Sequence, residues 1–331
     1  MSPSIIIMFF LAAVYGYLNG QYGSASIVST MISSRSIGPR LALWLAAAGM
    51  FLGPFVLGTA VATTISSDFI RHDTIDETAV IAALAGAILW CSLMLWLKLP
   101  ISISQALIGG LIGAVAIGFG GQAIQVGGLI KILIGLFLSP LLGLVGGFFA
   151  VIISYALSAN ATPHLNRWFQ RGQVLISFFM ALSFGSNDGQ KLMGIIVLGL
   201  VSAGMTRSYV VPLEVIIFSA VALGIGTAMG GWRLIHTMGG KFYKIRPIHG
   251  FGAQVASTAV IWGSGVMGWP VSGSQVVTSA ILGAGSADRI RKVRWGIAQQ
   301  ILVGWLLTIP ASALVSAVIY IVVKFLSVRM V

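Results

Sequence analysis

Long apolar runs are the feature that most restricts the fold of this chain. About ten stretches, each near the 20 residues that a helix needs to cross a bilayer core, follow one another with only short polar segments between them. Backbone N–H and C=O groups inside a bilayer must be bonded within the protein, which favours helices. The sequence therefore predicts an all-α, polytopic (multi-pass) integral membrane protein of the cell membrane.

The apolar runs also give approximate helix positions. Two of them are longer than one span requires, and Pro140 and Pro310 are positions where each could break into two shorter helices. We expect spans near residues 4–24, 40–65, 78–97, 106–121, 126–157, 172–184, 190–205, 212–232, 251–268, 276–286 and 295–326.

Charge is scarce and unevenly placed. Only 8% of the 331 residues are charged, and the net charge of +12 comes from bases in short loops rather than from a basic face interleaved with aromatic residues. This distribution excludes nucleic acid as a partner and leaves the lipid bilayer. The basic loops lie near residues 35–40, 164–171, 232–250 and 288–295, and the acidic loop is 66–78. The positive-inside rule predicts that the basic loops face the cytoplasm.

The sequence repeats itself at a nearly constant offset. "LPISISQALIGGLIGA" at 99–114 matches "WPVSGSQVVTSAILGA" at 269–284, and Gly-Thr-Ala recurs at 58–60 and 226–228. Many secondary transporters consist of two such halves, usually inverted, with the substrate between them. We expect a first transmembrane repeat at 1–157, a short basic connecting loop at 158–171 and a second repeat at 172–331.

The duplicated segment itself is too polar to face lipid. We interpret each copy as the tip of a broken-helix or re-entrant hairpin that breaks at Pro100 or Pro270, with the second arm offering free N–H groups and hydroxyls to an anion. The alternative is that the serines only cap a helix, as in ordinary proteins. The predicted anion-binding residues are Ser102, Ser104, Gln105, Ser272, Gly273, Ser274 and Gln275.

One acid lies deep within an apolar region. Asp188 stands in "FGSNDGQK", and an ionised carboxylate at membrane depth usually marks an ion or proton path. We predict that Asn187 and Asp188 bind the coupling ion, Na+ or H+, on backbone that is locally unwound. The alternative is a structural ion pair between Asp188 and Lys191. The predicted supporting residues are Gly185, Ser186, Gly189, Gln190 and Lys191.

Several segments resemble one known family. "FGSNDGQKLMGIIVLGL" is similar to a signature of the inorganic phosphate transporter (PiT) family, and so are "STMISSRSIGPRLALWLAAAGMFLGPFVLGTAVATTI", "GGKFYKIRPIHGFGAQ" and "RKVRWGIAQQILVGWLLTIPASAL". The resemblance covers nearly the whole chain. It implies secondary active uptake of a tetrahedral inorganic oxyanion, most simply phosphate, coupled to Na+ or H+ by alternating access.

Two departures from the family pattern fall on the implied site. The first half reads "NGQYGSAS", so Gly23 replaces an acid and Ser26 replaces an amide, which leaves Asn19 and Ser26 to offer neutral oxygens to the cation. The hairpins read "PISISQ" and "PVSGSQ", with Gln105 and Gln275 where the family usually has histidine. Sulfate permeases, a branch of this family, depart at similar positions and form the alternative reading.

Other classes of function fit the sequence less well. A membrane-embedded enzyme would need a catalytic or metal set at depth, but the four histidines stand in segments that we predict to be loops, and His-Glu-x-x-His is absent. We expect no cofactor besides the coupling ion, and no disulfide within the chain because Cys91 is the one cysteine. An anion channel and a homodimer remain open.

Overall fold

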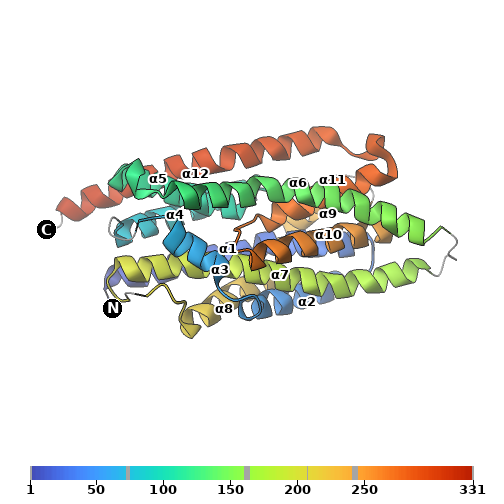
Figure 1. Cartoon of the computed structure of the whole chain (residues 1–331), viewed down its shortest axis with the longest axis horizontal. Coiled ribbons are helices and arrows are strands. Elements are labelled where there is room, and N and C mark those ends of the chain that lie inside the picture. Colours follow the sequence, from blue (N-terminus) through green and yellow to red (C-terminus); the bar gives the residue numbers. More distant parts are fainter. Residues whose placement is uncertain (1, 72–74, 160–164, 207, 241–244, 330–331) are drawn as a thin grey trace.

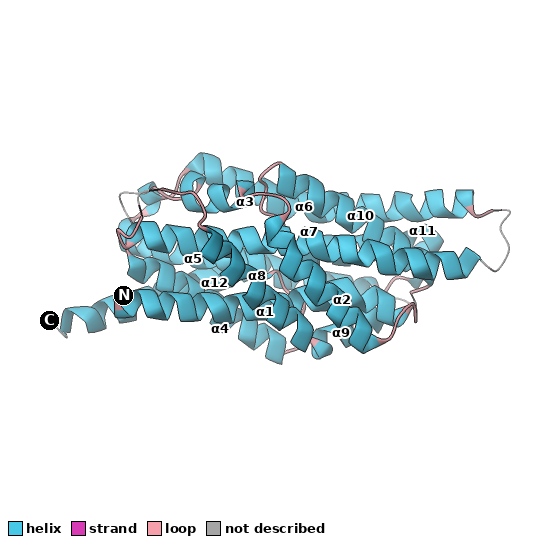
Figure 2. Cartoon of the chain, turned by 90° about the horizontal axis from the view of Figure 1, so that it is seen from below, coloured by secondary structure: helices cyan, strands magenta, loops and turns pink. Residues whose placement is uncertain are grey.

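The protein is a bundle of helices that is elongated along the helix axes (Figures 1 and 2). The computed structural model describes residues 2–71, 75–159, 165–206, 208–240 and 245–329, and the only β-type pairing among them is an isolated bridge between Ile70 and Ile124. The helices are α1 (Pro3–Ser33), α2 (Pro39–Leu52), α3 (Ala60–Thr63), α4 (Glu77–Trp96), α5 (Ile103–Phe119), α6 (Val126–Leu157), α7 (Leu165–Ser202), α8 (Leu213–Met229), α9 (Trp232–Gly240), α10 (Pro247–Val266), α11 (Gly273–Arg289) and α12 (Trp295–Arg329).

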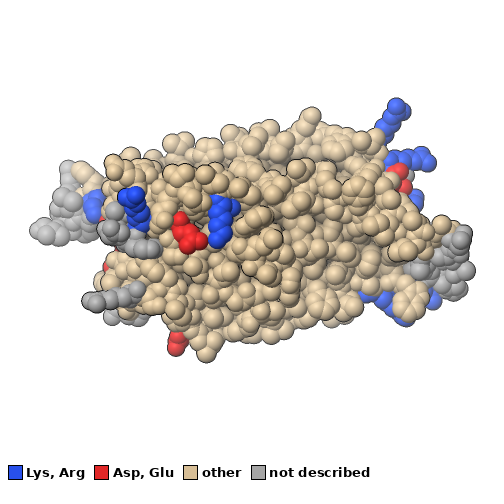
Figure 3. Space-filling view, in the orientation of Figure 1, with Lys and Arg blue, Asp and Glu red and all other residues tan. Residues whose placement is uncertain are grey.

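The bundle has the character of a membrane protein. Among the described residues, α1, α4, α6 and α12 are each long and apolar enough to cross a bilayer. Two further pairs, α2 with α3 and α8 with α9, meet the same length and composition test when each pair is taken together, and they are bent by 69° and 68°, as in a broken span or a re-entrant loop. On the face shown in Figure 3, charged side chains lie in two groups towards opposite ends of the molecule, and a belt without charged side chains separates the groups. The predicted all-α, multi-pass fold is confirmed.

The two halves run in opposite directions. The N- and C-termini lie at the same end of the bundle, whereas α7 begins at the opposite end (Figure 1). Close packing gives the antiparallel register of α1 and α7, because Gly16 faces Leu192 and Gly23 faces Phe184. The predicted inversion is therefore confirmed. The helix ends that flank the predicted basic loops lie at the end of the bundle where α7 begins (Figure 1).

The halves also exchange their last helices. α6 packs mainly on α10 and α11, and α12 packs mainly on α4 and α5, so each hairpin is covered by a helix from the other half. Small residues make these contacts close, as is usual between membrane helices. A Cβ atom at Gly113 of α5 would overlap the backbone of Ala313 in α12, and one at Gly283 of α11 would overlap the backbone of Leu144 in α6.

The proposed breaks at Pro140 and Pro310 are wrong, because α6 and α12 are single helices that contain these prolines. Close contacts just before and just after Pro140 in the sequence support the helix there. An ideal Cβ at Gly135 would lie 2.8 Å from the carbonyl oxygen of Pro270, and one at Gly143 would lie 2.6 Å from that of Val276. A proline inside a membrane helix is tolerated when neighbouring helices hold the chain in this way.

The predicted unwinding around Asp188 is also wrong. α7 runs unbroken from Leu165 to Ser202, so the expected spans at 172–184 and 190–205 are one helix, which begins inside the expected connecting loop. The glycines serve packing instead. A Cβ at Gly185 would overlap the backbone of Met50, and one at Gly189 would lie 2.8 Å from the Pro54 ring. Glycine at these two positions allows the end of α2 and the turn that follows it to approach α7.

Candidate functional site

Each duplicated polar segment is the tip of a helical hairpin. α4 and α5 are joined by residues 97–102, and α10 and α11 by residues 267–272. Ser102 and Ser272 are the N-caps of the second arms: their Oγ atoms accept from the backbone N–H groups of Gln105 (3.1 Å) and Gln275 (3.4 Å). The predicted breaks are confirmed. For these two serines the structure contains the capping bonds of the alternative, and Ser272 Oγ also lies 3.4 Å from Ser274 Oγ.

The second serine of each copy reaches across to the other tip. Ser104 Oγ donates to the carbonyl of Val271 (3.5 Å), and Ser274 Oγ donates to the carbonyl of Ile101 (3.3 Å). These two bonds correspond to each other under the 170-residue offset of the repeat. The inverted repeats therefore bring the two hairpin tips together.

Lys191 joins the two tips to α7. Its Nζ donates to Asp188 Oδ1 (2.6 Å), to Ser104 Oγ (2.7 Å) and to the carbonyl of Val271. Lys191 is 1% exposed and Asp188 is 5% exposed. Asp188 is the one acid that is buried in the described part of the chain. The Asp188–Lys191 pair that we set out as an alternative is thus present, and it lies at the junction of the hairpins rather than on an outer face.

Buried amides around this junction lack partners. Such groups cost about 1–3 kcal/mol each when they stay unsatisfied, so native proteins usually give them a partner, which can be water, an ion or a ligand. Asn187 Nδ2 donates to the Trp269 carbonyl (3.2 Å), which places this residue beside the second tip. The atoms without a hydrogen-bond partner include Asn19 Nδ2, Gln105 Oε1 and Nε2, Asn187 Oδ1 and Gln275 Oε1.

Asn19 and Ser26, the predicted cation-coupling residues of the first half, lie at different levels along the bundle. The antiparallel register puts Asn19 of α1 at the level of Asp188, between the Gly16 and Gly23 contacts. Ser26 lies about two helical turns further along, roughly 10 Å from that level. Its hydroxyl donates to the Tyr22 carbonyl (3.4 Å) and to Met238 Sδ (3.8 Å). The structure places Asn19 at the level of the site along the bundle and Ser26 away from it.

The predicted supporting residues fix the surroundings of the site. Gln190 Oε1 accepts from the backbone N–H of Val61 (2.7 Å), and this bond attaches α3 to α7. The Nε2 of Gln190 donates to Ser186 Oγ within α7 (3.2 Å). Gly273, which we predicted to bind the anion, has a packing role in the structure: a Cβ there would lie 2.5 Å from the Phe184 ring, so glycine allows that tip to rest on α7. At Gly23 the family's acid is absent, and the Met50 side chain would lie 3.1 Å from a Cβ there.

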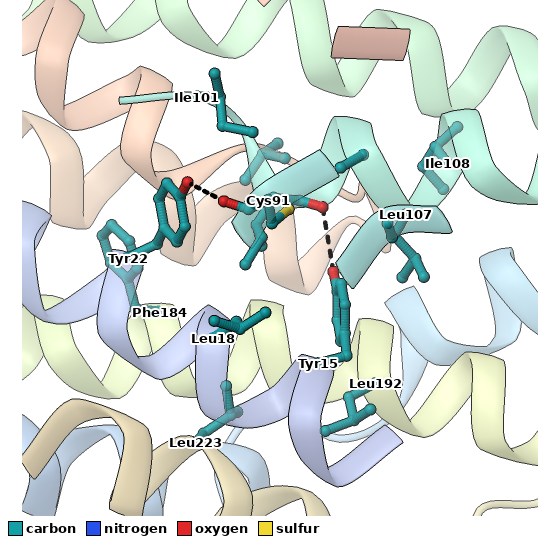
Figure 4. Close-up of a cluster of buried hydrophobic side chains, with 14 of the residues drawn as sticks. Tyr15, Leu18, Tyr22, Cys91, Ile101, Leu107, Ile108, Phe184, Leu192 and Leu223 are labelled. Atoms are coloured by element: carbon teal, nitrogen blue, oxygen red, sulfur yellow. Dashed lines mark hydrogen bonds between the residues drawn. The ribbon is translucent and has the colours of Figure 1, made fainter. Parts of the chain in front are cut away.

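The sequence pattern did not identify two tyrosines that hold the first hairpin. Figure 4 shows Tyr15 and Tyr22 reaching from α1 towards α4 and α5. Tyr22 Oη donates to the Cys91 carbonyl (2.9 Å), and Tyr15 Oη donates to the Ile103 carbonyl (3.3 Å). The sequence feature that could have identified them is their spacing of two turns on a buried helix, because a buried tyrosine hydroxyl needs a partner.

The histidine prediction needs correction. His236 lies in α9 and His249 in α10, not in loops, while His72 and His164 fall outside the described residues. His249 Nε2 is 2.8 Å from Tyr155 Oη. Within the described residues, no group of three or more His, Cys, Asp or Glu side chains is arranged to hold a metal ion.

Comparison with known proteins identifies the family. The profile of the phosphate transporter family (PHO4) matches residues 19–316, and that segment includes both hairpins and the Asp188–Lys191 pair. The chain belongs to this family. It is 35% identical over 325 residues to the "Probable low-affinity inorganic phosphate transporter" of Bacillus subtilis, with 97% of each chain covered. It is 36% identical over 321 residues to the protein of that name in Rhizobium meliloti, with 96% of each covered.

A solved structure gives the same fold for this member of the phosphate transporter family. "The sodium-dependent phosphate transporter" superposes with a TM-score of 0.88 at 20% identity, covering 98% of this chain and 100% of that chain. Family membership and the apolar helices identify an integral, multi-pass transporter of the cell membrane. The sulfate alternative finds no support in these similarities.

Proposed function

We propose that the protein carries inorganic phosphate across the cell membrane by alternating access, together with a cation. One observation carries the proposal: the tips of two inverted hairpins meet at a buried ammonium group, Lys191, near buried amide atoms that have no hydrogen-bond partner. Phosphate would accept from Lys191 and from the amide groups, and its own O–H would donate to the amide oxygens. The family and the names of the relatives support the same anion.

The balance of donors and acceptors favours phosphate over sulfate. Gln105, Gln275 and Asn187 each bury an amide oxygen without a donor. Phosphate near neutral pH carries one or two protons and satisfies such oxygens, whereas sulfate carries none and leaves them unpaired. A site rejects a competitor most strongly when binding it leaves buried polar groups without partners.

Coupling follows from the partners of Lys191. In the structure its ammonium group is paired with the Asp188 carboxylate at 2.6 Å. When phosphate binds, its negative charge attracts the same ammonium group, and the Asp188 carboxylate is released to attract a cation. We propose Na+ as that cation, with Asn187 Oδ1 and the Asp188 carboxylate as hard oxygen ligands. The sodium dependence in the name of the solved relative supports this choice over a proton.

Unlabelled sulfate should compete poorly with labelled phosphate. We expect the purified protein in proteoliposomes to concentrate radiolabelled phosphate, and we expect sulfate to need at least about tenfold higher concentration than unlabelled phosphate for half-inhibition. The comparison is made at pH 6 and pH 8, because phosphate is mostly monoanionic at the first and mostly dianionic at the second. Equal or stronger competition by sulfate at both pH values would overturn the phosphate assignment. Equilibration without accumulation would indicate a channel.

The crossing serines should contribute to anion binding. We expect Ser104→Ala and Ser274→Ala each to raise the phosphate concentration for half-maximal uptake by roughly 10-fold, because each removes a hydroxyl from a buried site and costs about 1–3 kcal/mol. Ser286→Ala is the matched control, since Ser286 lies in α11 and, among the described residues, its hydroxyl donates to the Leu282 carbonyl of its own helix (2.8 Å) and to no other group. Unchanged half-saturation in both tip variants would limit these serines to a structural role.

A further inference from the structure

A polar cavity lies far from the hairpin tips. It has a volume of about 450 Å³ and is lined by Ser36, Arg167, Gln170, Arg171 and Val174. The cavity lies between the first turns of α7 and the turn that joins α1 to α2, at the basic end of the molecule. The rise of a helix puts Arg171 about 30 Å along α7 from Lys191. The cavity is therefore separate from the site described above.

The charge of this cavity is uncompensated. Arg167 and Arg171 are one helical turn apart, no acidic side chain lines the cavity, and neither arginine has an ion pair within the part of the chain that the structure describes. Both lie in the first two turns of α7, whose first turn contains no acid. The N-terminus of a helix already carries partial positive charge, so two cations there repel it unless an anion is bound.

The wall opposite the arginines is fixed in place. Ser34 and Ser36 both donate to Oε1 of the buried Gln173 side chain, at 2.7 and 2.6 Å. Between them Arg35 adopts φ of +56°, a left-handed conformation that is uncommon for a residue other than glycine. The turn is thus bonded to α7 beside the cavity, and Ser36 is held at the position where it lines the cavity together with Arg167 and Arg171.

The position of the cavity indicates where its ligand comes from. Trp168, between the two arginines in sequence, is 69% exposed, and tryptophan at such positions is typical of the membrane–water interface. By the positive-inside rule this end faces the cytoplasm, where anionic lipids and free phosphate are both present. We propose that the cavity is a second oxyanion site, which holds a phosphate group through Arg167 and Arg171. Paired arginines bind the oxygens of phosphate through charge-assisted hydrogen bonds.

Two probes distinguish the sources of that phosphate group. The full-length protein and its Arg167→Gln/Arg171→Gln variant are placed in nanodiscs of dioleoyl phosphatidylcholine with or without dioleoyl phosphatidylglycerol, and inorganic phosphate is titrated in a separate series. Thermal unfolding and lipid retention in native mass spectrometry are measured. The matched control is Arg291→Gln/Arg294→Gln, which removes two exposed charges from another basic loop.

We expect the Arg167/Arg171 variant to lose about tenfold or more in affinity for one of the two probes, while the control variant behaves as the wild type. Loss of phosphatidylglycerol retention would assign the lipid headgroup, and loss of one component of the phosphate titration would assign free phosphate. If the double variant does not fold, Arg167→Lys/Arg171→Lys keeps the charge and should weaken binding less. Wild-type binding of both probes by the arginine variants overturns the proposal. Uptake of phosphate is measured separately, so the result stands whether or not the hairpin site is correct.

Discussion

Replacing Asp188 by asparagine is expected to abolish the accumulation of phosphate against its gradient. The carboxylate is the one buried acid of the described residues, and its proposed release from Lys191 is the step that links anion and cation. Without the charge the cation loses its ligand. Radiolabelled phosphate in proteoliposomes should fall to the level of passive equilibration, with an imposed Na+ gradient and with an imposed proton gradient.

The same substitution should also lower stability, and this effect must be separated from transport. Lys191 would stay buried without its counter-charge, at a cost of about 3–5 kcal/mol. The variant Asp188→Asn/Lys191→Met removes both charges, so we expect it to regain most of the thermal stability and to remain unable to accumulate phosphate. If Asp188→Asn folds and still accumulates phosphate as the wild type does, Asp188 is not the coupling site. If a proton gradient alone drives the wild type, Na+ is the wrong cation.

Gly113→Leu should destabilise the packing of the transporter. A Cβ atom at this position would already overlap the backbone of Ala313, so a leucine side chain must push α5 and α12 apart. Overpacking of this kind costs about 3 kcal/mol or more, which corresponds to a fall in Tm of roughly 5–10 °C. Size-exclusion chromatography and thermal unfolding of the purified protein measure the effect.

Gly263→Leu is the control for that substitution. Gly263 is exposed on α10, and nothing lies within 4 Å of a Cβ atom built there. We therefore expect a monodisperse protein with wild-type Tm and uptake. A Gly113→Leu protein that matches this control would show that α5 and α12 can separate at little cost.

Local patterns made the hairpins and the inverted repeat predictable from the sequence. A proline followed by Ser-x-Ser-Gln ends one helix and caps the next, and its recurrence at an offset of 170 relates the two copies. The bond between Ser104 and the second tip was not predictable in the same way. It depends on how two segments far apart in the sequence meet, which no local pattern records.

The error at α7 has a physical reason. Gly185, Ser186 and Gly189 are weak helix formers, so propensity favoured unwound backbone. Tertiary packing overrode it, because the backbone of α2 and the Pro54 ring occupy the space that side chains would need. A glycine cluster in a membrane helix is compatible with both outcomes. The helix that packs against the cluster determines whether the cluster stays helical, and the sequence alone does not identify that helix.

The exchange of α6 and α12 has a consequence for the synthesis of the protein. The first hairpin is complete when the ribosome passes Phe119, but its covering helix begins at Trp295. At about 5–20 residues per second, the glycine-lined face of α5 waits roughly ten to thirty-five seconds for that helix. During this interval lipid or the insertion machinery must cover that face of α5 in the incomplete chain. A stalled or truncated chain would leave the face uncovered.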